Sequence, residues 1–107
     1  MDGVTDAPFR YITDIYGKPD IIYTEFVSVK GLIIGKPAIQ RMLLRHQTET
    51  KTIAQFFGCE PEYFYQAALV ALKKGFDGVD INMGCPDKSV FHRGAGAGLI
   101  LQPKLAK

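Results

Sequence analysis

Three side chains of types that bind flat ring systems or transfer protons lie near the ends of apolar runs. Gln55 lies in the run Ile53–Phe57, Asn82 lies near the end of the run Gly78–Met83, and Cys85 follows that run. An amide in an apolar strand costs free energy unless its N–H and C=O groups are both hydrogen-bonded. A flat heterocycle with alternating C=O and N–H groups would satisfy this amide, and a neighbouring backbone group is the alternative partner.

Cys85 lies in a turn of restricted geometry. Pro86 fixes its own φ and lacks an N–H, while Gly84 permits close approach of the backbone to a ligand. A cysteine thiol is mostly protonated at neutral pH, so it can act as a general acid. The alternative is a small buried apolar residue, as most free cysteines are. Cys59 has no comparable context, and we expect it to serve packing.

A glycine-rich segment, 93–98, follows this turn. Its glycines suit either a phosphate cradle at a helix N-terminus or a tight turn with close helix packing. Lys88, His92 and Arg93 lie on the same loop. We expect Lys88 and Arg93 to contact an anionic substrate, and a solvated surface loop is the alternative.

Strand-like and helix-like segments alternate along the chain, and they must position these side chains. Asp6 followed by Pro8 predicts a helix start, and Gly17 and Pro19 predict its end. The segment 28–47, broken by glycine and proline, predicts two short helical pieces. The remaining expectations are a helix over 7–16, strands over 21–27, 51–57 and 78–83, a helix over 60–74 and a further helix start near 99.

This alternation predicts an α/β fold with a parallel sheet. Glu25, Gln55 and Asn82 each lie near the carboxyl end of a strand, at intervals of about 30 and about 27 residues. We expect them to meet at one end of the sheet, with the strands adjacent in chain order. Eight such units make a (β/α)8 TIM barrel, so the chain is expected to form a partial barrel of the first three to four units. A doubly wound fold would place a glycine-rich turn after its first strand.

Composition narrows the class of protein. The 107 residues carry 13 Lys and Arg against 11 Asp and Glu, a net charge of +2 that leaves nucleic acid open as a partner. The absence of a long apolar run predicts no membrane span, and the absence of a basic, then apolar leader predicts a cytoplasmic protein. Two cysteines and two histidines are too few, at this spacing, for a structural metal site or a disulfide framework.

Several sequence strings, spread over essentially the whole chain, resemble one family. They are Met1–Arg10, Glu25–Lys30, Gln55–Glu62, Asp80–Pro86 and Gly94–Leu99. The strings resemble those of the flavin-dependent tRNA-dihydrouridine synthases, whose FMN-binding TIM barrel is followed by a helical domain that helps to hold tRNA. The resemblance implies that residues 1–107 are the N-terminal fragment of that barrel.

The resemblance also implies roles for single residues. Met1 and Asp2 match the end of a motif that contacts FMN, and Gln55 matches the glutamine that hydrogen-bonds the flavin ring. Cys85 matches the proton donor, and Asn82 matches the asparagine near the uracil. Reduction of the C5=C6 bond of uridine would take a hydride from flavin and a proton from Cys85, after the base has left its stack. NADPH is the reductant that the family implies.

Two alternatives stay open at this point. Flavin barrels of the dihydroorotate dehydrogenase type also carry Asn and Cys-Pro near a strand end, and a truncated, non-catalytic remnant would at most bind RNA or a partner. We expect the isolated 107-residue chain to associate, because its strand edges and an apolar sheet face with Ile53, Phe57 and Ile81 lack cover. We also expect it to bind FMN weakly and to show no synthase activity.

Overall fold

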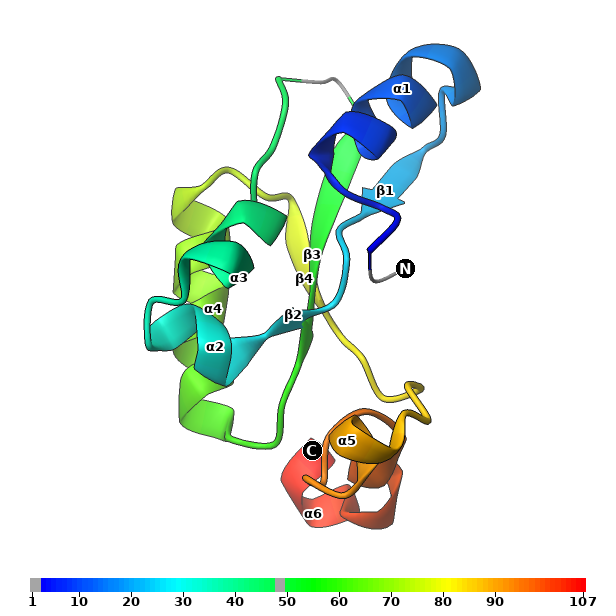
Figure 1. The fold of residues 1–107 in the computed structure, drawn as a ribbon. Helices are drawn as coiled ribbons and strands as arrows, with labels where there is room; N and C mark the ends of the chain where they lie inside the picture. Colours follow the sequence, from blue (N-terminus) through cyan, green and yellow to red (C-terminus); the bar gives the residue numbers. More distant parts are fainter. Residues whose placement is uncertain (1–2, 48–49) are drawn as a thin grey trace.

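The computed structural model describes residues 3–47 and 50–107. Met1 and Asp2, for which an FMN contact is predicted, lie outside the described residues. The helices and strands alternate in an α/β arrangement (Figure 1). In chain order they are α1 (Ala7–Gly17), β1 (Ile21–Tyr23), β2 (Val27–Ser28), α2 (Val29–Ile33), α3 (Pro37–Met42), β3 (Lys51–Phe57), α4 (Pro61–Lys73), β4 (Gly78–Ile81), α5 (Lys88–Phe91), the 3-10 helix η1 (Gly96–Leu101) and α6 (Pro103–Ala106).

The sheet is parallel, with β3 at its centre. β1 and β2 follow one another along one edge of β3, and β4 pairs with the other edge. The predicted order of three adjacent parallel strands is therefore confirmed. In this register Gln55 lies opposite Asp80, and Phe56 lies opposite Ile81.

The predicted single strand over 21–27 is wrong, because a β-bulge divides it. Tyr23 lies opposite Ile53, whereas Val27 lies opposite Phe56. Four steps along the edge strand thus match three steps along β3, which is the count of a bulge with one extra residue.

Thr24 supplies the hydrogen bonds within the bulge. Its N–H donates to the Ile53 carbonyl at 3.0 Å, and its Oγ1 accepts from the Gln55 N–H at 3.0 Å. The same hydroxyl donates to the Glu25 carbonyl at 2.7 Å. A buried side-chain hydroxyl therefore takes the place of a strand carbonyl beside Gln55.

The two faces of the sheet differ in cover. Thr52, Ala54 and Phe56 of β3 are buried, while the alternating Ile53, Gln55 and Phe57 are half-buried. In Figure 1, α2, α3 and α4 cover the side of the sheet to which these buried residues point. The core there consists of Val27, Val29, Leu32, Leu43, Ala54, Phe56, Ala67, Ala71 and Phe76. We call the face of Ile53, Gln55, Phe57, Asp80 and Asn82 the open face.

Ile81 does not lie on the open face, so that part of the expectation is wrong. It pairs with Phe56, and paired residues of neighbouring strands point to the same side. Ile81 therefore belongs to the helix-covered side, although 43% of it is exposed. The expectation failed because apolar character does not reveal the strand register.

The predicted helices over 7–16 and 60–74 are present, and the residue that ends the first of them differs from the expected one. Asp6 caps α1 by accepting the Phe9 N–H at 2.9 Å. α1 ends with Lys18 in the left-handed region at φ 44°, where Gly17 was the expected stop. The two predicted helical pieces in 28–47 are α2 and α3, and α4 occupies the predicted 60–74 segment.

Two differences follow β4. The strand ends at Ile81 and not at the expected Met83, and the Asn82 side chain bonds the turn that follows. The expected loop after Pro86 contains α5, whose N-cap Asp87 accepts the N–H groups of Ser89 and Val90. α5, η1 and α6 form a group beyond the carboxyl ends of the strands (Figure 1).

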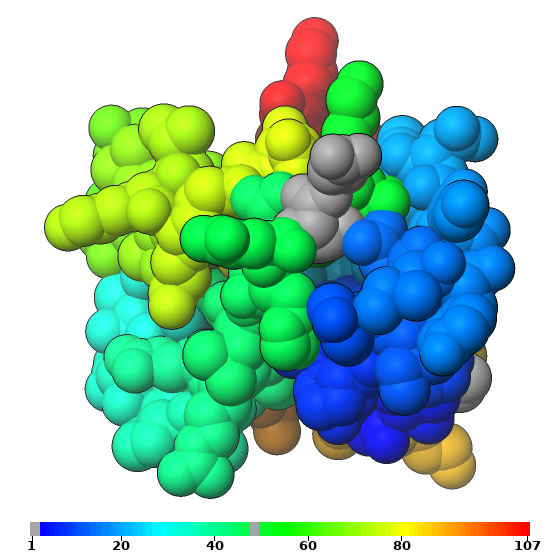
Figure 2. Space-filling view, turned by 90° about the horizontal axis from the view of Figure 1, so that it is seen from above, coloured from blue at the N-terminus to red at the C-terminus, as the bar shows by residue number. Residues whose placement is uncertain are grey.

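The segment that follows α3 lies between α1 and the α2–α4 region (Figure 2). The buried Arg10 of α1 donates to the Leu44 carbonyl of this segment at 2.5 Å and to the Thr5 carbonyl at 2.6 Å. Burial lowers the pKa of Arg10, and the charges of Glu25 and Asp6 oppose this shift.

Of the helices in the described ranges, none has the length and apolar character of a membrane span.

Candidate active site

Five residues at and after the carboxyl ends of β3 and β4 form a continuous hydrogen-bonded chain. Gln55 Nε2 donates to Asp80 Oδ2 at 2.7 Å, and Asn82 Nδ2 donates to Gln55 Oε1 at 3.2 Å. Asn82 Oδ1 accepts the backbone N–H of Cys85 at 2.9 Å and that of Gly84 at 3.1 Å. We call Asp80, Gln55 and Asn82 the amide relay, and it ends on the turn that carries Cys85.

Strand geometry explains why these side chains meet. Gln55 and Asp80 are direct partners in the register of β3 and β4, so their side chains project from the same face. Asn82 lies two residues after Asp80, and alternate residues of a strand share a face. The backbone N–H of Asn82 still donates to the Phe56 carbonyl at 2.8 Å, which extends the ladder to this residue.

Gln55, Asn82 and Cys85 are therefore brought together, as expected. Glu25 lies at the same end, but it is buried and its Oε1 accepts the Gly3 N–H at 2.6 Å. It holds the N-terminal segment against the bulge.

The Gln55 amide is hydrogen-bonded to the side chains of Asp80 and Asn82. The partners expected from the sequence were a heterocycle or a backbone group. An amide has two N–H donors and two lone pairs, and the relay uses one of each. One N–H and one lone pair are left for a ligand. Ile53 and Phe57 flank Gln55 on the half-buried open face, so an apolar surface adjoins this donor and acceptor pair. A flat heterocycle such as a flavin ring fits this combination.

Both backbone groups of Cys85 are held by other segments. Its N–H is bonded by Asn82, and its carbonyl accepts the Ala97 N–H at 3.0 Å. Gly96 adopts φ +56°, and a Cβ at this position would lie 2.7 Å from the Cys85 carbonyl oxygen. η1 therefore packs directly on the cysteine turn, and Cys85 is half-buried.

Close packing accounts for the glycines of the 93–98 segment. A Cβ on Gly98 would lie 2.7 Å from the Phe91 carbonyl oxygen, and one on Gly94 would lie 2.7 Å from Gln102 Nε2. Of the two interpretations of these glycines, the tight turn with close packing is the one that the contacts support.

Lys88 and Arg93 lie at the exposed border of α5. Among the described residues, no hydrogen bond joins either side chain to the amide relay. Hydrogen bonds from Ser89 lower the pKa of Asp87, and the positive charge of Arg93 adds to this effect. The predicted contact of Lys88 and Arg93 with an anionic substrate stays a prediction.

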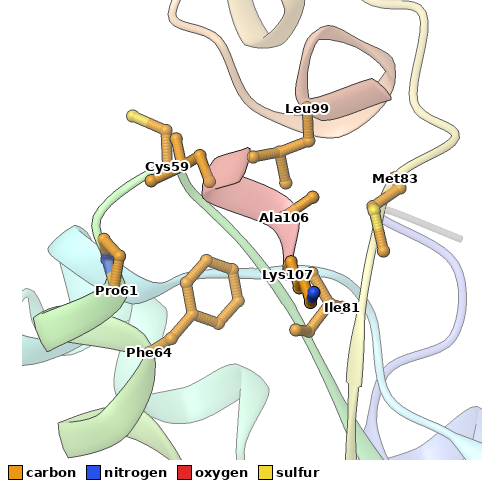
Figure 3. Close-up of a pocket in the computed structure, with 9 residues that line it drawn as sticks. Cys59, Pro61, Phe64, Ile81, Met83, Leu99, Ala106 and Lys107 are labelled. Carbon is orange, nitrogen blue, oxygen red and sulfur yellow. The ribbon is translucent and has the colours of Figure 1, made fainter. Parts of the chain in front are cut away.

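A pocket of about 210 Å³ lies on the helix-covered side of β4, away from the amide relay (Figure 3). Ile81 and Met83, which alternate with the relay residues, line it together with Phe64 and Leu99. Cys59 also lines this pocket, where burial and then the Glu60 carboxylate raise the pKa of its thiol. The lining is largely apolar and contains no relay residue, so this pocket is separate from the relay, and the expectation that Cys59 serves packing stays a prediction.

Comparison with known proteins identifies the family. The sequence model of the dihydrouridine synthase (Dus) family matches residues 1–107. The chain belongs to the dihydrouridine synthase family. The predicted resemblance to this family is thereby confirmed.

Individual relatives of the family are similar over nearly the whole chain. A probable tRNA-dihydrouridine synthase of Staphylococcus aureus (strain COL) is 35% identical over 99% of this chain. Probable tRNA-dihydrouridine synthase 2 of Bacillus subtilis (strain 168) is 36% identical over the same share. The chain spans about a third (33%) of the length of each of these relatives.

Asp80 is the site residue that sequence reasoning missed. It lies in one of the strings that carry the family resemblance, but it has no predicted role of its own. Its signal was the spacing, because Asp80 precedes Asn82 by two residues and therefore shares its face. The pairing with Gln55 was not available from spacing, because it depends on the register of β3 and β4.

Proposed function

We propose that this chain is the N-terminal part of the catalytic domain of an FMN-dependent tRNA-dihydrouridine synthase. The reaction is reduction of the C5=C6 bond of uridine in tRNA, with NADPH as the reductant. Family membership and the names of the relatives support this activity. The parallel sheet with regularly spaced βα units supports a partial TIM barrel over residues 1–107. Action on tRNA suits a cytoplasmic protein.

Gln55 is the residue of this chain that would orient the cofactor. Its free N–H and free lone pair can bond the polar edge of the ring, while Ile53 and Phe57 can contact the apolar part. When bound, reduced FMN supplies the hydride that C6 of the uracil receives. Met1 and Asp2 complete the proposed FMN contacts.

Cys85 is the proposed proton donor. Its Sγ–H bond would break as the proton passes to C5, leaving a thiolate that regains a proton from water. Both backbone groups of Cys85 are held, so the position of the thiol is set before substrate binds. Such preorganisation reduces the entropy that must be lost at the reacting geometry.

Asn82, Lys88 and Arg93 are the proposed contacts with tRNA. The relay uses one Nδ2 hydrogen of Asn82 and its Oδ1, so this residue can offer the other Nδ2 hydrogen to a uracil carbonyl. Lys88 begins α5 and Arg93 lies two residues after its end, in the group of helices beyond the carboxyl ends of the strands (Figure 1). Basic side chains in this place suit phosphate groups of the RNA backbone.

The observation that carries this proposal is the continuous hydrogen-bonded chain from Gln55 to the Cys85 N–H. The test uses the complete protein, purified and examined for the visible absorbance of flavin. It is then incubated with unmodified tRNA and NADPH, and dihydrouridine is measured by mass spectrometry of the nucleosides. We expect a yellow protein that forms dihydrouridine.

Two results would contradict the proposal. A protein that binds no FMN, even when FMN is added, would be a non-catalytic remnant. A flavin-containing protein that oxidises dihydroorotate and leaves tRNA unchanged would belong with the other flavin barrels.

A further inference from the structure

The amide relay has a direction that its two ends impose. A carboxylate such as that of Asp80 only accepts hydrogen bonds, and the backbone N–H groups of Gly84 and Cys85 only donate. Two amides, Gln55 and Asn82, lie between these ends. A single orientation of both amides gives every donor an acceptor.

We propose that Asp80 is a positioning residue, which stabilises the one direction of both amides that the Gly84 and Cys85 N–H groups also require, and thereby holds the Cys85 turn and the Gln55 amide in one arrangement. This inference rests on the proposed function, since it concerns the same site. Its distinctive part is that Asp80, beside Gln55 on β4, would set the orientation of the proposed reacting groups through hydrogen bonds and not through contact with substrate or cofactor.

Reversal of Gln55 shows what Asp80 prevents. In the reversed amide, Oε1 would face the Asp80 carboxylate and Nε2 would face the Nδ2 of Asn82. Both contacts would then join like groups, and partly buried polar groups without partners are costly. The free N–H of Gln55 therefore stays on the Asp80 side and its free lone pair stays on the Asn82 side. A ring that binds this amide must match that order of donor and acceptor.

Exchange of one amide for one carboxylate tests the direction. In Asn82→Asp the new side chain has no donor, so an oxygen must face an oxygen either at Gln55 or, if Gln55 reverses, at Asp80. Asp80→Asn can accept from Gln55 or donate to it, but Asn82 still presents its Nδ2 to Gln55 Oε1, so this single variant keeps the parent direction. In the double variant Asp80→Asn/Asn82→Asp, the new amide can donate to Gln55 Oε1, and reversed Gln55 can donate to the new carboxylate. That carboxylate still accepts the N–H groups of Gly84 and Cys85, and the net charge equals that of the parent.

All variants are made in the complete protein, with the exposed Asp20→Asn as the control for loss of a negative charge. The first two readouts are the midpoint of thermal unfolding and the rate of Cys85 alkylation by iodoacetamide. The alkylation rate is followed by peptide mass spectrometry, which separates Cys85 from Cys59. Both are measured without FMN, tRNA or NADPH. The third readout is titration with FMN.

We expect Asn82→Asp to lower the unfolding midpoint and to change the Cys85 alkylation rate by about tenfold, as loss of a partly buried hydrogen bond would. The double variant should return both quantities close to the parent values. Its affinity for FMN should stay about tenfold or more below that of the parent, because the Gln55 amide is reversed. If Asn82→Asp does not fold, recovery of soluble protein in the double variant serves as the first readout.

A double variant no better than Asn82→Asp in midpoint and alkylation would overturn the role of Asp80. A double variant that binds FMN as the parent does would overturn the part of the proposal that concerns the orientation of Gln55. These results are separate from the proposed function, since dihydrouridine formation by the parent protein is measured independently of them.

Discussion

At the scale of single residues, Cys85 is positioned by its backbone. Asn82 and Ala97 bond its N–H and its carbonyl, and Gly96 leaves room for its carbonyl oxygen. None of these contacts involves Sγ. Replacement of the side chain should therefore leave the turn in place, and a change in reaction rate can be assigned to the thiol.

Cys85→Ala is expected to keep FMN binding and to lose most dihydrouridine formation in the complete protein. Loss of a general acid costs about 10²–10⁴-fold in rate, and the proposed contact of Gln55 with the cofactor is left unchanged. The measurement is single-turnover formation of dihydrouridine in tRNA, with Cys59→Ala as the control that keeps the parent rate. A Cys85→Ala protein that reacts at the parent rate would show that the cysteine is structural.

Cys59 provides a prediction on pH dependence. Burial, followed by the charge and hydrogen bond of Glu60, raises its pKa, so less thiolate is present at a given pH. Glu60→Gln removes the negative charge beside the thiol and leaves the burial of Cys59 unchanged. The pKa of Cys59 should fall part of the way to that of an ordinary thiol. More thiolate is then present at about pH 7–8, so alkylation of Cys59 should become faster there. The pH profile of alkylation checks this, with the exposed Glu62→Gln as the control. An unchanged profile would show that burial alone sets the shift.

At the scale of elements, Gly96 joins η1 to the cysteine turn. Gly96→Ala places a Cβ against the Cys85 carbonyl and forces a left-handed φ on alanine. We expect a loss of about 2–4 kcal/mol in stability, from backbone strain and overpacking together. Gly84→Ala is the matched control, since a Cβ there meets nothing within 4 Å. The two unfolding midpoints, measured side by side, decide the matter, and equal midpoints would contradict the packing role of Gly96.

Arg10 joins α1 to the segment after α3. Arg10→Met keeps much of the side-chain volume but removes the two charge-assisted bonds to the Thr5 and Leu44 carbonyls. The expected cost is about 2–3 kcal/mol, which thermal unfolding measures. Arg41→Met, at an exposed position of α3, should change the midpoint little. A similar loss in both variants would indicate that the charge matters more than the contacts.

The elements that could be predicted are those with local signals. Asp6 and Pro8 mark the start of α1, and the alternating apolar residues of β3 mark that strand. The bulge at Thr24 had no such signal, because β-branched and aromatic residues are equally common in continuous strands. α5 was missed although Asp87 is a good N-cap, since the glycines that follow suggested a loop.

At the scale of the whole molecule, part of the site followed from topology. Parallel strands put their carboxyl ends together, so the sequence alone predicts that Gln55, Asn82 and Cys85 meet. Asp80 and Ile81 depend on the register of β3 and β4, which the one-dimensional pattern does not fix. The exposure of Lys88 and Arg93 agrees with either interpretation of their loop.

The 107-residue chain expressed alone is expected to self-associate, to bind FMN weakly and to be inactive. Ile53 and Phe57 are only half-buried on the open face, and several large apolar side chains are exposed, including Tyr16 and Leu72. Exposed apolar patches and strand edges promote association. Size-exclusion chromatography with an FMN titration tests this. A stable monomer that binds FMN stoichiometrically would contradict it.

The bond from the Ala97 N–H to the Cys85 carbonyl makes one backbone amide a reporter of the site. A bonded amide proton exchanges with deuterated water only when its bond opens. Ala97 lies in η1, so its exchange rate would follow every opening of the cysteine turn without a label on the thiol. Slower deuterium uptake there on addition of FMN or tRNA would record how firmly each one closes the turn, even in variants that carry out no reaction.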